Sequence, residues 1–273
     1  KEIVCQSERL GLREHILRCG DLSRQYGAVL ILEDDLYVSP GLVTYALAAL
    51  AEYGAAASIA GISLYAPAMN ETAQVPFCAL ADGSDVFFAR YPSSCGQGWT
   101  CGQWNGFRAW YDHGRQEGRP LNPALPPDVL AWPDSSWKRH FLDYMVANDL
   151  YFVYPRVSLT TNCGDAGTHF AAAHGEFQVP LLWGPGQYRF RALPDSNCVY
   201  DEYWELLPSR LARLNPAFAM DGLLADLHGR KPLGRFPHAR RVLTVKPCRQ
   251  AQASYGRELK PIELNVIREM PGS

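Results

Sequence analysis

The sequence predicts an α/β fold with a mostly parallel sheet flanked by helices. Apolar runs of strand length occupy residues 28–32, 59–65 and 150–159, and they lack the polar alternation of a half-exposed strand. Helical spacing of apolar residues fills the segments around them, at residues 7–26, 39–53 and 135–148. Helices that alternate with fully apolar strands are typical of α/β folds.

Local signals set the expected limits of these elements. Ser7 is a candidate N-cap of the first helix, and Gly27 is expected to end it. The pair Ser39 and Pro40 opens the next helix, because a hydroxyl cap is followed by proline at the first helical position. Further short elements are expected as strands at 75–77 and 85–90, around the turn Asp82-Gly83, and as a helix at 104–113.

The second half of the chain carries weaker patterns. Loops rich in glycine, proline or polar residues are expected at 93–106, 114–133 and 160–174, and scattered strand and helix signals follow residue 175. We therefore expect a core at residues 1–175 and, at 176–273, a C-terminal extension that packs on it.

Composition narrows the classes of function. The chain has 273 residues and a net charge of −2, so no basic field favours nucleic acid. Its apolar stretches are much shorter than the ~20 residues of a membrane span, and residues 1–18 lack the apolar core of a signal peptide. None of the eight cysteines forms a Cys-x-x-Cys pair. We expect reduced thiols in the cytoplasm, with a local Cys95–Cys101 bridge or a metal role as alternatives.

The strongest chemical signal is an acidic turn in VLILEDDLYVSP. Glu33, Asp34 and Asp35 follow the buried run directly. Three adjacent acids at the end of a buried strand are costly unless a cation compensates them. A Mn²⁺ or Mg²⁺ ion with a diphosphate would do so, because hard cations take carboxylate and phosphate oxygens. Ligands also bind beyond the carboxyl ends of strands in open α/β sheets. The alternative is a solvated acidic loop, favoured by the dipole of the following helix.

The segment VLILEDDLYVSPGLVTYALAAL resembles the strand–EDD–helix unit of GT-A glycosyltransferases of the N-acetylglucosaminyltransferase I type. It is also similar to family-2-like glycosyltransferases of bacterial surface-polysaccharide clusters. Four later segments resemble that family in the same order: GISLYAP, PSSCGQGWTCGQW, DSSWKRHFLDYM and VYPRVSLTTNCGDAGTHF. The resemblance covers residues 7–175 and implies a GT-A fold and a nucleotide-sugar donor.

The resemblance implies roles for the matched positions near the acidic turn. Asp35 would bind the metal, and Asp34 and Glu33 would contact the ribose or the metal-bound waters. Gly96, Gly98 and Trp99 would form the floor under the donor sugar. The alternative for this last segment is a tight turn with a core tryptophan.

An inverting transfer needs a base for the acceptor hydroxyl. By the resemblance, Asp143 is the first candidate and Asp134 the reserve; a helix cap or a surface carboxylate is the alternative for either. His169 would complete the metal shell or bind the diphosphate as the glycine-rich loop closes, unless it is a solvent-exposed loop residue. Asp165 in the same loop is a weaker candidate for donor binding. Arg156 is either a diphosphate partner or a surface residue.

The sequence departs from the family at its start. Only one helix precedes the acidic strand, whereas the family has a base-binding unit there, so we expect the chain to be a fragment lacking the N-terminal strands of the domain. The alternative is a protein that has lost base binding and no longer acts as a transferase. The resemblance implies an inverting glycosyltransferase that uses a nucleotide-diphosphate sugar, expected to be a UDP-sugar, and a glycan or polysaccharide acceptor. It also implies a cytoplasmic location, with peripheral association at the inner membrane. The alternatives are a non-catalytic carbohydrate- or partner-binding module and a metal-dependent hydrolase.

Overall fold

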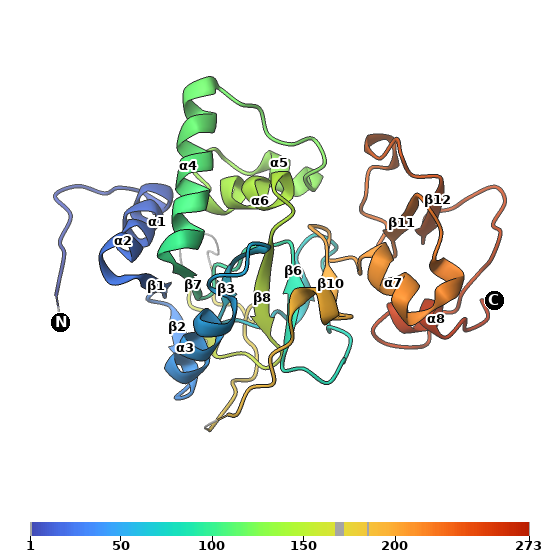
Figure 1. Ribbon diagram of the computed structural model, residues 1–273, viewed down its shortest axis with the longest axis horizontal. Helices are drawn as coiled ribbons and strands as arrows, with labels where there is room; N and C mark the ends of the chain where they lie inside the picture. Colours follow the sequence, from blue (N-terminus) through green and yellow to red (C-terminus); the bar gives the residue numbers. More distant parts are fainter. Residues whose placement is uncertain (1, 167–171, 185, 273) are drawn as a thin grey trace.

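The computed structural model describes residues 2–166, 172–184 and 186–272. It confirms a mixed α/β fold in which helices flank a central six-stranded sheet (Figure 1). The strand order is β1-β7-β3-β8-β6-β10. These strands span Ala28–Ile31, Gln97–Thr100, Ile59–Ser63, Tyr151–Pro155, Val86–Ala89 and Val199–Tyr200, in that order across the sheet.

The sheet combines both strand directions. β3 pairs with β8, and β6 with β10, in parallel. The pairs β1–β7, β7–β3 and β8–β6 are antiparallel. The expected parallel strands β1, β3 and β8 do run the same way, but β7 is inserted between β1 and β3 in the opposite direction. Consequently β1, β3 and β8 end at the same edge of the sheet, and β7 begins there.

Helices cover both faces of the sheet because its strands alternate their side chains between two hydrophobic clusters. Phe87, Phe152 and Tyr154 pack toward α1, α4 and α6, whereas Phe88 and Val153 pack toward α3. The helices are α1 Leu12–Asp21, α2 Ser23–Tyr26, α3 Leu42–Tyr53, α4 Cys101–Glu117, α5 Pro127–Ala131, α6 Trp137–Ala147, α7 Pro208–Leu214 and α8 Glu263–Ile267. Short 3-10 turns occur at Leu193–Asp195, Pro216–Phe218 and Leu233–Arg235.

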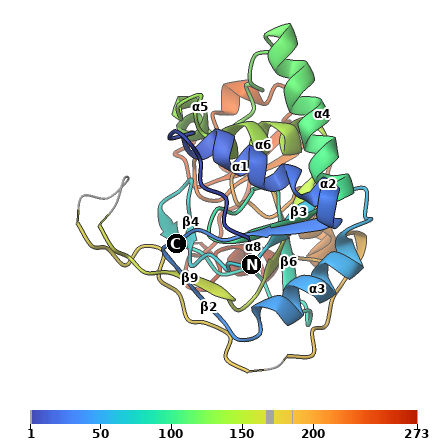
Figure 2. The same ribbon diagram turned by 90° about the vertical axis from the view of Figure 1, so that its left-hand side faces the viewer.

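Three two-stranded ribbons complete the fold. β2 (Leu36–Val38) pairs antiparallel with β9 (Thr160–Asn162), which connects the segment after the acidic turn to the loop that follows β8 (Figure 2). β4 (Met69–Asn70) pairs with β5 (Val75–Pro76), and β11 (Leu223–Asp226) with β12 (Arg241–Thr244). β9 was expected to be loop, and the strand expected at 75–77 pairs with β4 instead of with residues 85–90.

The expected boundary at residue 175 does not divide the chain into two structural units. β10 lies beyond that boundary and pairs with β6 at the edge of the sheet. α7, β11, β12 and α8 lie together beyond that edge (Figure 1). Their apolar residues Leu211, Leu227 and Val266 belong to the same buried cluster as Ile16 of α1. The segments after residue 175 therefore add a strand to the sheet and share the buried cluster of the core.

Among the described residues, no helix has the length and apolar character needed to cross a bilayer.

Candidate functional site

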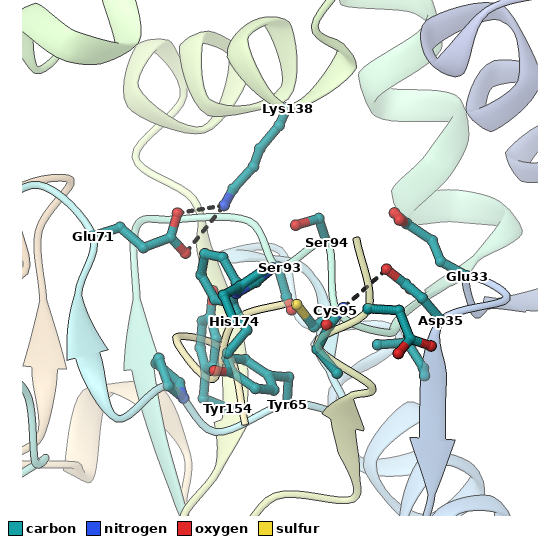
Figure 3. A pocket seen from close by; sticks show the side chains of 15 residues that line it. Glu33, Asp35, Tyr65, Glu71, Ser93, Ser94, Cys95, Lys138, Tyr154 and His174 are labelled. Atoms are coloured by element: carbon teal, nitrogen blue, oxygen red, sulfur yellow. Dashed lines mark hydrogen bonds and ion pairs between the residues drawn. The ribbon is translucent and has the colours of Figure 1, made fainter. Parts of the chain in front are cut away.

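A pocket of about 180 Å³ lies at the edge of the sheet where β1, β3 and β8 end (Figure 3). The acidic turn after β1 contributes Glu33 and Asp35 to its lining. Tyr65 follows β3, Tyr154 stands near the end of β8, and Cys95 precedes β7. The pocket is therefore built from segments that are far apart in the sequence but meet because their strands share one edge.

The three acids of the turn have different surroundings. Glu33 is partly buried, whereas Asp34 and Asp35 are exposed. Burial raises the pKa of Glu33 to about 7, and the charges of Asp35 and Asp34 add to this effect. Asp35 is held in place because its side chain accepts a hydrogen bond of 2.9 Å from Asn162 and its carbonyl one of 2.7 Å from the Cys163 amide. Glu33 and Asp35 thus share one wall of the pocket, and Asp34 does not line it.

Glu71 and Lys138 line the same pocket and were not among the residues that the sequence indicated. Lys138 belongs to the first turn of α6, and its ammonium group lies 2.7 and 3.1 Å from the two carboxylate oxygens of Glu71. Figure 3 shows this pair on the opposite side of the pocket from Glu33 and Asp35. No motif predicts this pair, because the two residues are 67 positions apart and meet only in the folded chain.

Four carboxylates line the pocket, from Glu33, Asp35, Glu71 and Asp165, together with the single lysine Lys138. The acids outnumber this ammonium group, so the pocket favours a cation. Within the described part of the chain, no three His, Cys, Asp or Glu side chains form a metal shell. Two carboxylates suffice for Mg²⁺ when substrate phosphates and waters supply the remaining oxygens. Glu33 and Asp35 fit that role.

Trp99 does not form a floor for a sugar. Its side chain is fully buried in the core of the molecule. It packs against Trp104, Phe141 and Phe152 with ring centroids 4.9 to 6.2 Å apart. The core-tryptophan alternative is therefore the right one, because β7 turns this side chain toward the helices and away from the pocket.

The structure disfavours a side chain at each of the two glycines before Trp99, for a different reason at each. Gly96 has a φ of 97°, and a Cβ there would lie 3.0 Å from Thr160 and 3.2 Å from Leu32. Gly98 lies within β7, where a Cβ would lie 2.5 Å from the Leu30 side chain. Gly96 adjoins the pocket residue Cys95, whereas Gly98 is needed for packing within the sheet.

Asp143 and Asp134, the two expected bases, line a different hollow between α4 and α6. Asp143 is buried, burial raises its pKa, and it accepts a 3.0 Å hydrogen bond from the Asn122 amide. Asp143 follows Lys138 by five positions in α6, so the two side chains point about 140° apart around the helix axis. Since Lys138 faces the candidate pocket, Asp143 faces away from it, and its expected place beside the donor is wrong.

Asp134 is a surface residue that does not cap α6. It forms ion pairs of 2.8 Å with Arg13 and 3.2 Å with Arg115, and its carboxylate lies 3.3 Å from a ring nitrogen of His140. Ser136 is the N-cap, and its hydroxyl accepts the amide hydrogen bond of Arg139 at 3.3 Å. The surface-carboxylate alternative therefore holds for Asp134, and the N-cap alternative does not.

The remaining expected residues separate into three cases. Asp165 lines the pocket together with Asp35 and Asn162, and its role in donor binding stays a prediction. Arg156 is held by the Ser84 carbonyl at 2.6 Å and the Asp82 carboxylate at 3.0 Å, so it fixes a loop and does not reach the pocket. His169 lies outside the described residues.

The cysteines are free thiols in the described structure, so the alternative of a Cys95–Cys101 bridge does not hold. Cys95 lies in the pocket between the two walls (Figure 3). Burial raises the pKa of its thiol to about 12, against a lowering effect of Lys138. Cys95 is therefore a neutral side chain at neutral pH.

Comparison with known proteins adds no assignment to this geometry. No protein-family model matches the chain, and a search of curated proteins finds no match.

Proposed function

We propose that the protein is a metal-dependent, inverting glycosyltransferase of the GT-A class that uses a nucleotide-diphosphate sugar. The observation that carries this proposal is the pocket at the carboxyl ends of β1, β3 and β8, which has Glu33 and Asp35 on one wall. Such an edge is where open α/β sheets bind ligands. Of the three acids that the resemblance implicates, Glu33 and Asp35 line this pocket.

Glu33 and Asp35 would hold a Mn²⁺ or Mg²⁺ ion, which when bound neutralises the diphosphate of the donor. The partial burial of Glu33 and its acidic neighbours make its ionised form costly without a cation. Asp35 is positioned in advance by Asn162, so its carboxylate needs little reordering to bind an ion. The resemblance supplies the rest of the proposal. The donor is a uridine diphosphate sugar and the acceptor is a glycan or polysaccharide. The protein acts in the cytoplasm, at the inner membrane.

The direct test is isothermal titration of the full-length protein with UDP in the presence and absence of Mn²⁺. We expect binding that depends on the metal. Absence of binding at millimolar UDP with saturating Mn²⁺ would refute the proposed function.

A second function, a non-catalytic carbohydrate-binding module, is favoured by one observation. Asp143 and Asp134, which the motifs indicate as bases, both lie outside the pocket. Release of UDP from UDP-sugars separates the two functions, because a binding module holds the ligand and leaves the sugar–phosphate bond intact. A metal-dependent hydrolase would release UDP at the same rate with or without an acceptor.

A further inference from the structure

The pair of Glu71 and Lys138 is a built part of the pocket. Glu71 follows β4, in the turn before β5. The side chain of Asn70 is fully buried and accepts hydrogen bonds from the amides of Thr72 and Ala73 at 3.0 and 2.9 Å. Asn70 also donates to the Tyr203 carbonyl at 3.3 Å. The turn that carries Glu71 is therefore fixed to the core on both sides of the residue.

Lys138 fixes the carboxylate itself. Its side chain is 12% exposed and that of Glu71 is 26% exposed, so the pair is largely shielded from solvent. The ammonium group contacts both carboxylate oxygens and lies 4.7 Å from the centre of the Tyr91 ring. The contacts with both oxygens limit the rotation of the carboxylate.

The pair also faces the acidic turn across the pocket. Figure 3 shows Glu71 and Lys138 on one side, Glu33 and Asp35 on the other, and Cys95 between them. An inverting displacement needs the attacking oxygen and the leaving oxygen on opposite sides of the anomeric carbon. A diphosphate bound at Glu33 and Asp35 leaves the Glu71 side of the sugar open to the acceptor.

We propose that Glu71 is the general base of the transfer reaction and that Lys138 is its positioning residue; this inference rests on the proposed function. The acceptor hydroxyl gives its proton to a carboxylate oxygen of Glu71 as its oxygen forms a bond to the anomeric carbon. The bond between that carbon and the phosphate oxygen breaks, and its electron pair leaves with the nucleoside diphosphate. The substrate class is thus an alcohol acceptor, such as a sugar hydroxyl, and a nucleoside-diphosphate sugar.

Other carboxylates of the site fit this role less well. Glu33 and Asp35 lie on the wall assigned to the metal and diphosphate, and Asp143 faces away from the pocket. Asp165 lines the pocket and is exposed, whereas the side chain of Glu71 is 26% exposed and is held by Lys138. Among the carboxylates labelled in Figure 3, Glu71 is the one opposite Glu33 and Asp35.

The test measures UDP release with Mn²⁺ from UDP-glucose, UDP-galactose and UDP-N-acetylglucosamine, with water as the acceptor, alongside the dissociation constant for UDP. Glu71→Gln is expected to lower the turnover rate by about 100-fold or more, the usual contribution of a general base. Its UDP affinity is expected to stay within about threefold of the wild type. Glu52→Gln, an exposed acid on α3 outside the pocket, is the matched control and should leave both values unchanged.

Lys138 is tested by rescue. Lys138→Met is expected to lower turnover at unchanged UDP affinity, and Lys138→Arg to restore most of it, because arginine keeps the charge beside Glu71. A purely structural role would show as lost folding in Lys138→Met, checked by circular dichroism, and would contradict the assignment.

The outcomes separate this inference from the proposed function. Absence of metal-dependent UDP binding by the wild type refutes both. UDP binding without release from any of the three donors indicates the binding module and likewise refutes both, whereas full turnover by Glu71→Gln refutes the base alone. If Asp165→Asn loses turnover while Glu71→Gln remains active, the general base is Asp165 and not Glu71.

Discussion

At the scale of single residues, neighbouring side chains of the acidic turn have different surroundings. Asp35 lines the pocket and is held by Asn162 at 2.9 Å, whereas Asp34 is exposed and does not line the pocket. The resemblance gives both acids a place in donor binding, but the geometry distinguishes them.

We expect Asp35→Asn to weaken Mn²⁺-dependent UDP binding by about tenfold or more, because a neutral amide loses the charge that attracts the cation. Asp34→Asn is the matched control and should change the affinity by less than about threefold. Isothermal titration with Mn²⁺ and UDP measures both. An equal loss in the two variants would show that the turn acts only through its total charge.

Asp143 makes a structural contribution instead of a catalytic one. It is buried and accepts the Asn122 amide at 3.0 Å. Asp143→Ala leaves that amide without its partner, so we expect a loss of about 1–3 kcal/mol in the free energy of unfolding. UDP affinity should not change. Urea unfolding and UDP titration measure the two effects, and lost UDP binding in a folded Asp143→Ala protein would return this residue to the site.

Residues that are adjacent in the sequence were predictable, and residues that meet only in space were not. Glu33 and Asp35 follow a buried strand within a few positions, so strand pattern and charge identify them together. Glu71 and Lys138 belong to a hairpin turn and a helix 67 positions apart. Trp99 was placed in the site by the resemblance of its glycine-rich segment, but it belongs to β7, where the neighbouring Gly98 serves sheet packing. A single sequence carries no signal for these contacts.

At the scale of secondary-structure elements, β7 is the strand that most changes the expected topology. Its sequence Gln97–Thr100 contains a glycine and was expected to be loop, because glycine is unfavourable inside strands. Gly98 is nevertheless required there, since it faces the Leu30 side chain of β1. Strand propensity fails at β7 because contact between neighbouring strands decides which residue fits.

Gly98→Ala therefore tests the packing of β7 against β1. The added methyl group would lie 2.5 Å from the Leu30 side chain, so this side chain or the strands must shift, and we expect a loss of about 1–3 kcal/mol in stability. Gly102→Ala in α4 is the matched control, because its nearest neighbour would be 4.0 Å away and alanine favours the helix. Urea unfolding of both variants gives the comparison. Equal stability of the two would contradict the close approach of β1 and β7.

At the scale of the whole molecule, the C-terminal segments share one buried cluster with the core, but they also bury several charges. Glu205 and Glu263 are almost fully buried, and His228 lies 3.1 Å from Glu205. Lys231 is buried and pairs with Asp201. The composition of the C-terminal segments did not predict this cluster, because its members come from α8 and from the segments after β10 and β11.

Glu263 makes the stability of the whole chain depend on pH. Burial raises its pKa to about 7 from an ordinary 4.5; the His228 charge opposes this effect and that of Glu205 adds to it. Between these values the folded state holds a proton that the unfolded state has lost, so stability falls as pH rises from about 4.5 to 7. The pKa of His228 is also raised, through its hydrogen bond with Glu205 and against the effect of burial. Its stabilising contribution below about 6.5 is likewise lost as pH rises through the folded value.

Glu263→Gln should remove the glutamate part of this dependence and leave the histidine part. We expect the free energy of unfolding of the variant to match that of the wild type at pH 4 and to exceed it by about 2–3 kcal/mol at pH 8, measured by urea unfolding.

Because one hydrophobic cluster joins Ile16 of α1 to Val266 of α8, tryptophan fluorescence and far-ultraviolet circular dichroism should report a single unfolding transition. Two separate transitions, with only the first shifted by Glu263→Gln, would show instead that the C-terminal segments unfold independently of the sheet.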